Sequence, residues 1–183
     1  MKYSFSAFEN GFVRAAAASP ALRVADCAYN AQQIIAAMRA HAADGVQLLC
    51  LPEFSLTGYT CSDLFLQATL LQGAEKGLAD ILSASAELDI LTLVGLPVRH
   101  NAKLYNCAAV VCRGELLGLV PKTYLPNYGE FYEKRHFVPA MREAECIEFA
   151  GQETLIGTDL LFACKQLPDF VLGVEVCEDL WAP

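Results

Sequence analysis

The chain has 183 residues, enough for one domain with a substantial core, and 55% of them are hydrophobic. Its formal net charge of −8 argues against a nucleic-acid or anionic-membrane surface, because both kinds of surface need a basic patch. No window has the ~18 uninterrupted apolar residues of a membrane helix, and the first residues do not resemble a signal peptide, so a cytoplasmic protein is expected.

Strands and helices alternate in the first half of the chain. Short apolar runs predict strands over residues 12–18, 46–52 and 90–98. Helical periodicity predicts helices over residues 26–45 and 62–88. Asp26 is a candidate N-cap and Gly45 a stop signal for the first helix, while Gly73 and Gly77 are expected to bend the second.

The pattern changes after residue 98, where strands follow one another across short turns. Apolar runs predict further strands over residues 104–112, 115–121, 160–165 and 170–177. One of the turns is expected at Arg113 and Gly114. Alternating strands and helices followed by hairpin-connected strands indicate a layered α/β fold with a mixed sheet.

The eight cysteines are a further feature of the composition. They form no CxxC motif, and the three histidines stand far apart, so no zinc or other metal site is expected from local spacing. Most of the cysteines lie in apolar runs, which is typical of reduced, buried thiols in a cytosolic protein. On this interpretation seven are structural and one is reactive.

Three apolar strands are each followed by a reactive side chain: Glu53, Lys122 and Cys177. Chemistry in α/β folds usually lies just beyond the carboxyl ends of strands. A thiol, a cation that stabilises an oxyanion and a carboxylate that moves protons could together attack a carbonyl or nitrile carbon. The alternatives are ordinary: a turn carboxylate, a solvated lysine at a strand end and a core cysteine.

The sequences around these residues resemble a known family. The blocks LPEFSLTGY, PKTYLPNYGEFYEKRHF and GVEVCEDLW are similar, in that order, to the three signature blocks of the nitrilase superfamily. Within it they most resemble the N-terminal glutaminase domain of the glutamine-dependent NAD synthetases. The resemblance covers almost the whole chain, from about Phe12 to Pro183.

The resemblance implies an α-β-β-α four-layer sandwich. The chain stops soon after Cys177, so residues 1–183 are expected to be the N-terminal part of one glutaminase domain, truncated on its C-terminal side. The rest of this domain and an ATP-dependent synthetase domain would be absent. No SGGxDS phosphate loop occurs, so no cofactor is expected in this part, and ATP, Mg²⁺ and deamido-NAD would bind to the synthetase domain.

The resemblance also implies roles for individual residues. Glu53 would be the general base and acid, Lys122 the electrostatic stabiliser and Cys177 the nucleophile. Glu130, eight residues after Lys122, matches the second glutamate that the superfamily places beside these three. Further candidates for substrate binding are Tyr128 and Glu178, at the amino-acid head of the substrate, and Tyr59 and Phe131, at the mouth of the pocket.

The implied activity is release of ammonia from L-glutamine through a cysteine thioester, for amidation of deamido-NAD. The implied partners are glutamine, a synthetase domain and further copies of the chain in a homo-oligomer. One alternative is a stand-alone nitrilase-type amidase or carbamoylase that acts on another small amide. Another is a nitrilase-like module that has lost catalysis and serves assembly, although the presence of Glu53, Lys122 and Cys177 counts against it.

Overall fold

A single mixed sheet organises the structure, a computed structural model that describes residues 11–182. Its strands lie in the order β1-β2-β3-β4-β5-β7-β6. They are β1 (Ala15–Ala17), β2 (Leu48–Cys50), β3 (Leu91–His100), β4 (Lys103–Cys112), β5 (Glu115–Pro121), β6 (Glu145–Phe149) and β7 (Gln152–Ile156). The first three pair in parallel, and β3, β4 and β5 pair antiparallel, as expected for a mixed α/β fold.

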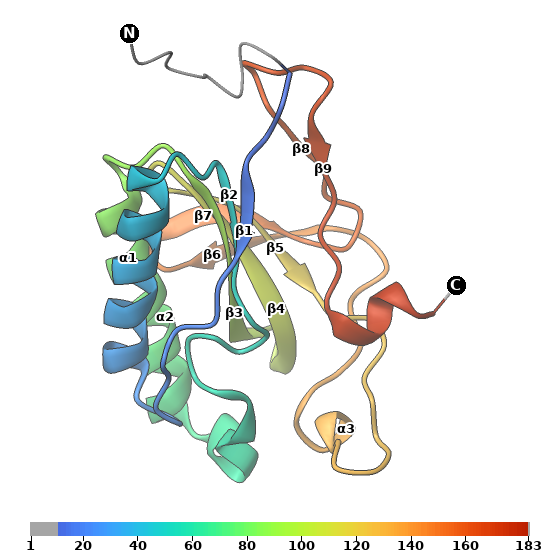
Figure 1. Cartoon of the computed structure of the whole chain (residues 1–183). Helices are drawn as coiled ribbons and strands as arrows, with labels where there is room; N and C mark the ends of the chain where they lie inside the picture. Colours follow the sequence, from blue (N-terminus) through green and yellow to red (C-terminus); the bar gives the residue numbers. More distant parts are fainter. Residues whose placement is uncertain (1–10, 183) are drawn as a thin grey trace, which may run out of the picture.

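Two long helices, α1 (Cys27–Ala43) and α2 (Ala68–Ser85), cover one face of the sheet (Figure 1). Asp26 caps α1 as predicted, because its side chain accepts a hydrogen bond from the N–H of Tyr29. The bend predicted within α2 is wrong: the helix runs unbroken through its glycines. Gly77 instead allows close packing, since a Cβ there would lie 3.1 Å from Leu56 and 3.5 Å from Ala31 of α1.

The predicted helix over 62–88 is replaced at its start by a 3₁₀ segment, η2 (Tyr59–Leu66). Strands β6 and β7, which pair antiparallel, and the short helix α3 (Glu133–His136) were not predicted. The alternation of buried and exposed residues in β6 is nevertheless a strand signal, with Ile147 and Phe149 facing the core.

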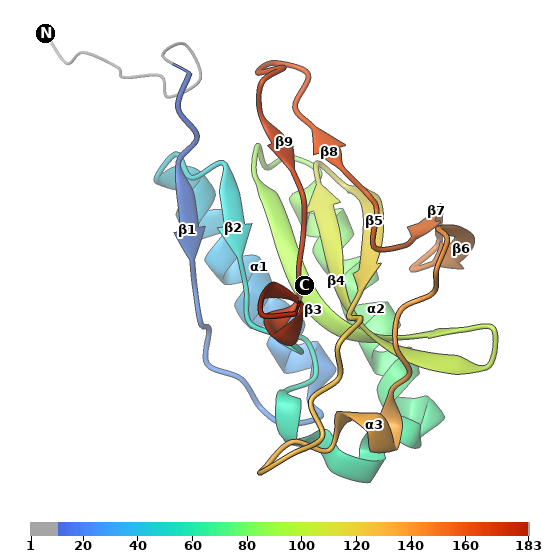
Figure 2. The same cartoon turned by 90° about the vertical axis from the view of Figure 1, so that its right-hand side faces the viewer.

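The last segment of the chain crosses the face of the sheet opposite the helices (Figures 1 and 2). It contains β8 (Phe162–Ala163), β9 (Val171–Leu172) and the 3₁₀ turn η3 (Cys177–Leu180). Gly118 of β5 makes room for β8, because a Cβ there would lie 3.0 Å from the Phe162 ring. The strand predicted over 170–177 is shorter than expected, because only Val171 and Leu172 pair with β8. The residues after them continue unpaired into the turn.

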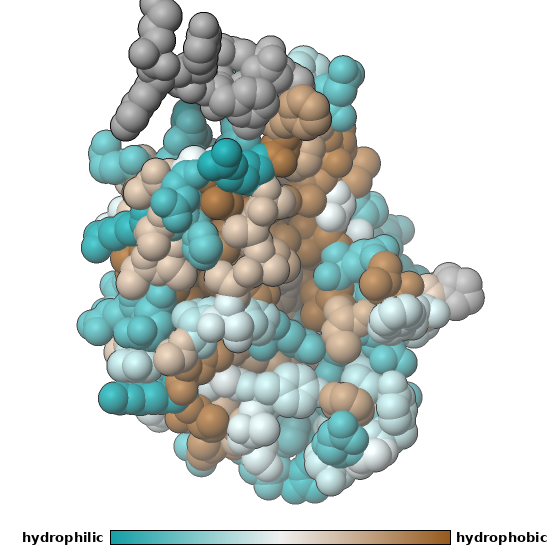
Figure 3. Space-filling view, viewed as in Figure 1, coloured by the Kyte–Doolittle hydropathy of each residue, from teal (hydrophilic) through white to brown (hydrophobic). Residues whose placement is uncertain are grey.

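Residues 11–182 supply one helical layer, one sheet and a two-stranded sheet on the opposite face. The remaining layers of the four-layer sandwich stay a prediction. Figure 3 shows an apolar area around β8 and β9, where Leu161 and Val171 are exposed. No helix within these residues is long and apolar enough to cross a membrane.

The prediction of seven buried cysteines is wrong. All eight thiols are free, but only Cys27, Cys61 and Cys107 are buried. Cys50 lies on β2, on the face of the sheet opposite the helices, and is exposed together with Cys146 and Cys177. An apolar stretch of sequence therefore does not bury every residue in it, because strand side chains alternate between the two faces.

Candidate active site

Glu53 lies in the loop that follows β2, and β3 holds this loop tightly. The N–H of Leu56 donates to the carbonyl of Gly95 at 3.1 Å, and the Ser55 hydroxyl accepts from the Gly95 N–H at 3.1 Å. Phe54, next to Glu53, has a left-handed φ of 53°, a conformation that a bulky residue seldom adopts. The loop thus forms a sharp turn that directs the Glu53 carboxylate toward β4 and β5.

Gly95 allows this close approach, and we expect Gly95→Ala to displace Glu53. A Cβ at Gly95 would lie 2.4 Å from the Phe54 nitrogen and 2.7 Å from the Pro52 oxygen, both of which are backbone atoms. The overlap should lower the free energy of unfolding by about 3 kcal/mol. The matched control is Gly173→Ala, whose new Cβ would meet nothing closer than 3.7 Å. Urea denaturation followed by circular dichroism measures both, and equal losses would contradict the packing argument.

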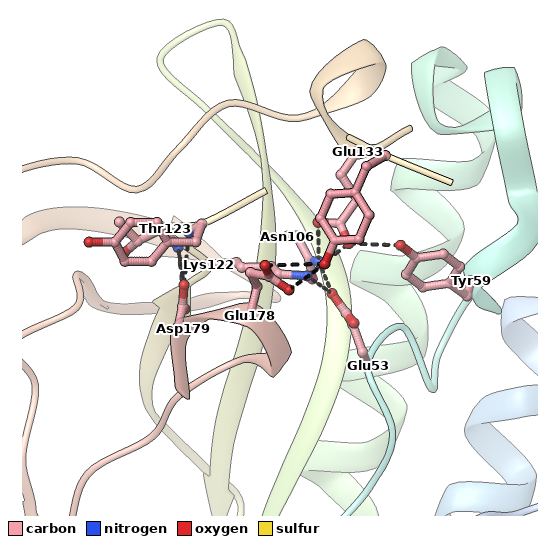
Figure 4. A network of polar contacts seen from close by, with 10 residues as sticks. Glu53, Tyr59, Asn106, Lys122, Thr123, Glu133, Glu178 and Asp179 are labelled. Atoms are coloured by element: carbon pink, nitrogen blue, oxygen red, sulfur yellow. Dashed lines mark hydrogen bonds and ion pairs between the residues drawn. The ribbon is translucent and has the colours of Figure 1, made fainter. Parts of the chain in front are cut away.

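Lys122 occupies the centre of the site, directly after β5, with a side chain that is fully buried. Its Nζ donates to Glu53 Oε1 at 2.8 Å and to Glu133 Oε1 at 2.7 Å (Figure 4). Burial lowers the pKa of the Lys122 ammonium, but the hydrogen bonds and charges of Glu133 and Glu53 outweigh this effect and raise the pKa above its ordinary value. Lys122 is therefore a fixed positive charge.

The glutamate beside Lys122 is Glu133, and the expectation that Glu130 lies there is wrong. Glu130 is exposed in the loop before α3, whereas Glu133 is 4% exposed at the first position of that helix. The Tyr59 hydroxyl also donates to Glu133 Oε1, at 2.7 Å. Burial raises the pKa of Glu133, although the hydrogen bonds from Lys122 and Tyr59 act in the opposite direction. The same sequence block contained both glutamates, and only the fold of α3 distinguishes them.

Asn106 on β4 is a site residue that the sequence analysis missed. Its side-chain amide donates to Glu53 Oε1 and, at 3.5 Å, to Glu133 Oε2, so it links the two carboxylates. The side chain is buried, and within residues 11–182 its oxygen has no hydrogen-bond partner. Carboxylates only accept hydrogen bonds, and only the nitrogen of the amide can donate them. The two contacts therefore fix the orientation of the Asn106 side chain.

Cys177 begins the turn η3 with a left-handed φ of 51°. Such strain in a residue other than glycine is typical of functional positions, and it presents the side chain on the outside of a sharp turn. Cys177 and Glu53 line the same cavity, of about 230 Å³, together with Glu175, Cys50 and Cys107. The structure thus brings the ends of β2, β5 and the last extended segment together, as the sequence analysis expected.

The charges around Cys177 act in both directions. Burial raises the pKa of its thiol above the ordinary value; Lys122 lowers this pKa, and Glu53 and Glu133 raise it. A thiol whose pKa is raised needs a neighbouring base to take its proton before the sulfur can act as a nucleophile. Glu53 is the candidate for that base, because it lines the same cavity.

The predicted substrate-binding residues contact one another and the residues of this site. The Tyr128 hydroxyl donates to Glu178 at 3.1 Å, which joins the loop after β5 to the turn η3. Phe131 packs edge-on against both Tyr59 and Tyr128, with ring centroids 6.3 Å and 5.7 Å apart. Tyr59 differs from the others, because its hydroxyl binds Glu133 directly and its pKa is raised by burial and by that hydrogen bond.

Comparison with known proteins shows the family of this chain. Residues 13–183 match the carbon-nitrogen hydrolase family. The chain belongs to this family. It is 45% identical to the glutamine-dependent NAD(+) synthetase of Mycobacterium tuberculosis, over 98% of this chain and 26% of the relative. The rat glutamine-dependent NAD(+) synthetase is 31% identical over 84% of this chain and 22% of its own length.

Solved structures of carbon-nitrogen hydrolases share the fold. A glutamine-dependent NAD(+) synthetase from Cytophaga hutchinsonii superimposes with a TM-score of 0.82 and 32% identity, over 91% of this chain and 28% of that one. A Nesterenkonia amidase, in which acrylamide has added to the active-site cysteine, gives a TM-score of 0.59 and 25% identity over 77% and 55% of the two chains. The chain therefore spans about a quarter of the length of the synthetases that it matches.

Proposed function

We propose that this chain carries the nucleophile of a glutaminase that releases ammonia from L-glutamine for a glutamine-dependent NAD synthetase. The observation that carries the proposal is the buried Lys122 held between Glu53 and Glu133, in a site whose cavity also exposes Cys177. The similarity of the chain to NAD synthetases supports a glutaminase over other carbon-nitrogen hydrolases. Glutamine, with a cationic α-ammonium group, fits the carboxylate of Glu178 beside the nucleophile.

The first half of the proposed reaction forms a thioester. The Cys177 sulfur attacks the side-chain amide carbon of glutamine while Glu53 takes the thiol proton. Lys122 stabilises the negative charge that develops on the amide oxygen, together with the N–H of Glu178. Glu53 then passes its proton to the amide nitrogen, the C–N bond breaks, and ammonia leaves.

The second half regenerates the enzyme. Glu53 takes a proton from water, whose oxygen attacks the thioester carbon. The C–S bond breaks, glutamate leaves, and the proton on Glu53 returns to the sulfur of Cys177. Lys122 keeps its proton throughout, in agreement with the direction in which the two carboxylates shift its pKa. One carboxylate therefore serves both halves of the cycle.

The proposal extends to the protein around this chain. Residues 1–183 would form the N-terminal part of the glutaminase domain, and a synthetase domain elsewhere in the protein would bind ATP, Mg²⁺ and deamido-NAD. The short share of each synthetase that the chain matches supports this arrangement. We further propose a cytoplasmic homo-oligomer, on the resemblance of the sequence to the synthetase family.

Glutamate release from glutamine, compared with release of ammonia from simple aliphatic amides, tests the proposed substrate. We expect glutamine to be preferred by at least about tenfold in kcat/KM, because burial of its α-ammonium beside Glu178 contributes only in glutamine. Glu178→Gln should remove most of this preference while simple amides react as before. A preference for simple amides in the unaltered protein would favour the alternative function, a stand-alone amidase like the Nesterenkonia enzyme.

Glu53→Gln should change two properties of the site in opposite directions. Loss of the carboxylate removes a charge that raises the pKa of Cys177, so iodoacetamide should modify Cys177 faster at neutral pH. The same change removes the general base, so glutamate release should fall by about 10²-fold or more. Peptide mass spectrometry follows the alkylation, and an unchanged rate in the Glu53→Gln variant would show that the two groups do not interact.

A further inference from the structure

Asp179 is the third acidic residue around Cys177, and it does not face the substrate cavity. It lies two residues after Cys177 in η3 and is half-buried. Its Oδ1 accepts hydrogen bonds from the backbone N–H groups of Thr123, at 3.0 Å, and Tyr124, at 2.8 Å (Figure 4). Hydrogen bonds to an ionised acceptor are roughly twice as strong as those between neutral groups.

The two donors directly follow Lys122, whose own backbone is fixed. The Lys122 N–H donates to the Asn106 carbonyl at 2.8 Å, and the Lys122 carbonyl accepts from Ala140 at 3.0 Å. The residues that bind Asp179 therefore directly follow a backbone position that is held to β4 at the end of β5. A carboxylate attached there has a defined position relative to the Lys122 ammonium.

The turn η3, which carries Cys177, makes few hydrogen bonds to the sheet. Residues 173–176 before it are extended but lie outside the paired strands, and Cys177 begins the turn in a strained conformation. The backbone hydrogen bonds from Asp179 to Val176 and from Trp181 to Glu178 are internal to the turn. A further link, from Glu178 to Tyr128, comes from a tyrosine that is 60% exposed.

We propose that Asp179 is a positioning residue that fixes the Cys177 thiol against Lys122 and Glu53 by anchoring the turn to the backbone after Lys122. The inference rests on the proposed role of Cys177 as the nucleophile. It explains why an acidic residue stands so close to a thiol: the Asp179 carboxylate is directed to the two backbone amides rather than to the sulfur.

The test measures how strongly Glu53 and Cys177 interact with and without the anchor. The pH dependence of Cys177 alkylation by iodoacetamide is recorded by peptide mass spectrometry for the unaltered chain and for Glu53→Gln, and the shift between their midpoints reports the interaction. In the Asp179→Ala background we expect this shift to shrink at least about threefold. In the Asp179→Asn background, where an oxygen can still accept from the two amides, most of the shift should return.

Asp169→Ala is the matched control, because Asp169 is an exposed aspartate between β8 and β9. It should leave the shift unchanged. Far-ultraviolet circular dichroism shows whether each variant is folded. A full midpoint shift in folded Asp179→Ala would overturn the proposal, as would an Asp179→Asn variant no better than Asp179→Ala. Alkylation needs no glutamine, so a failure of the glutaminase proposal, seen as glutamate release that survives Cys177→Ala, is a separate result.

Discussion

Replacement of Cys177 by alanine is expected to reduce glutamate release from glutamine by at least about 10³-fold, in the longer protein that we propose contains this chain. The reason is that the thioester cannot form without the sulfur, while binding and the charge of Lys122 remain. The glutamate that is released is measured by ion-exchange chromatography or by a coupled assay. The fold should survive, because Cys177 is exposed and begins a surface turn.

The matched control for this change is Cys50→Ala. Cys50 is also exposed and lines the same cavity as Cys177, yet it lies on β2 away from the strained turn. Glutamate release should stay within about twofold of the unaltered protein. Loss of activity in Cys50→Ala together with normal activity in Cys177→Ala would show that Cys50, and not Cys177, is the nucleophile.

Replacement of Lys122 by methionine is expected to affect both stability and catalysis. The change leaves Glu53 and Glu133 close together without their shared cation, and removal of one partner of a buried ion pair costs about 3–5 kcal/mol. Loss of oxyanion stabilisation should also lower kcat by about 10²–10³-fold. Lys76→Met, at an exposed lysine paired with Asp80, should change neither quantity appreciably.

A double variant separates the two effects of Lys122. In Lys122→Met combined with Glu133→Gln, only one carboxylate remains beside the neutral side chain, so we expect much of the lost stability to return. Glutamate release should remain low, since the positive charge is still missing. Recovery of activity along with stability would show that Lys122 serves the fold alone.

The protonation of Glu133 gives the site a pH dependence of stability. Burial raises its pKa in the folded protein above the unfolded value. A carboxyl group of this kind contributes stability that is present below its unfolded pKa and is lost as the pH rises through its folded pKa. The Glu133→Gln variant should lack this component, so its loss of stability between acidic and neutral pH should be smaller than that of the unaltered chain.

The sequence predicted the parts of the site that depend on local patterns. Apolar runs located β2, β5 and the final extended segment, and therefore the residues Glu53, Lys122 and Cys177 that follow them. Alternation of strands and helices also predicted the mixed sheet. These features depend on burial, which leaves a periodic record in the sequence.

Other parts of the site depend on contacts between distant segments. Asn106 lies 53 residues from Glu53, and Asp179 lies 56 residues from Thr123, so neither hydrogen bond has a local signal. The choice between Glu130 and Glu133 depends on a four-residue helix that is too short to predict from periodicity. Such contacts become visible only when the sheet brings the strand ends together.

The most direct test of the account is to stop the reaction with acid during turnover of glutamine and to identify the acylated residue by peptide mass spectrometry. The account predicts a glutamyl thioester on Cys177 in the unaltered protein and none in the Cys177→Ala variant. Turnover of glutamine with no adduct on Cys177, or with the adduct on another side chain, would contradict it.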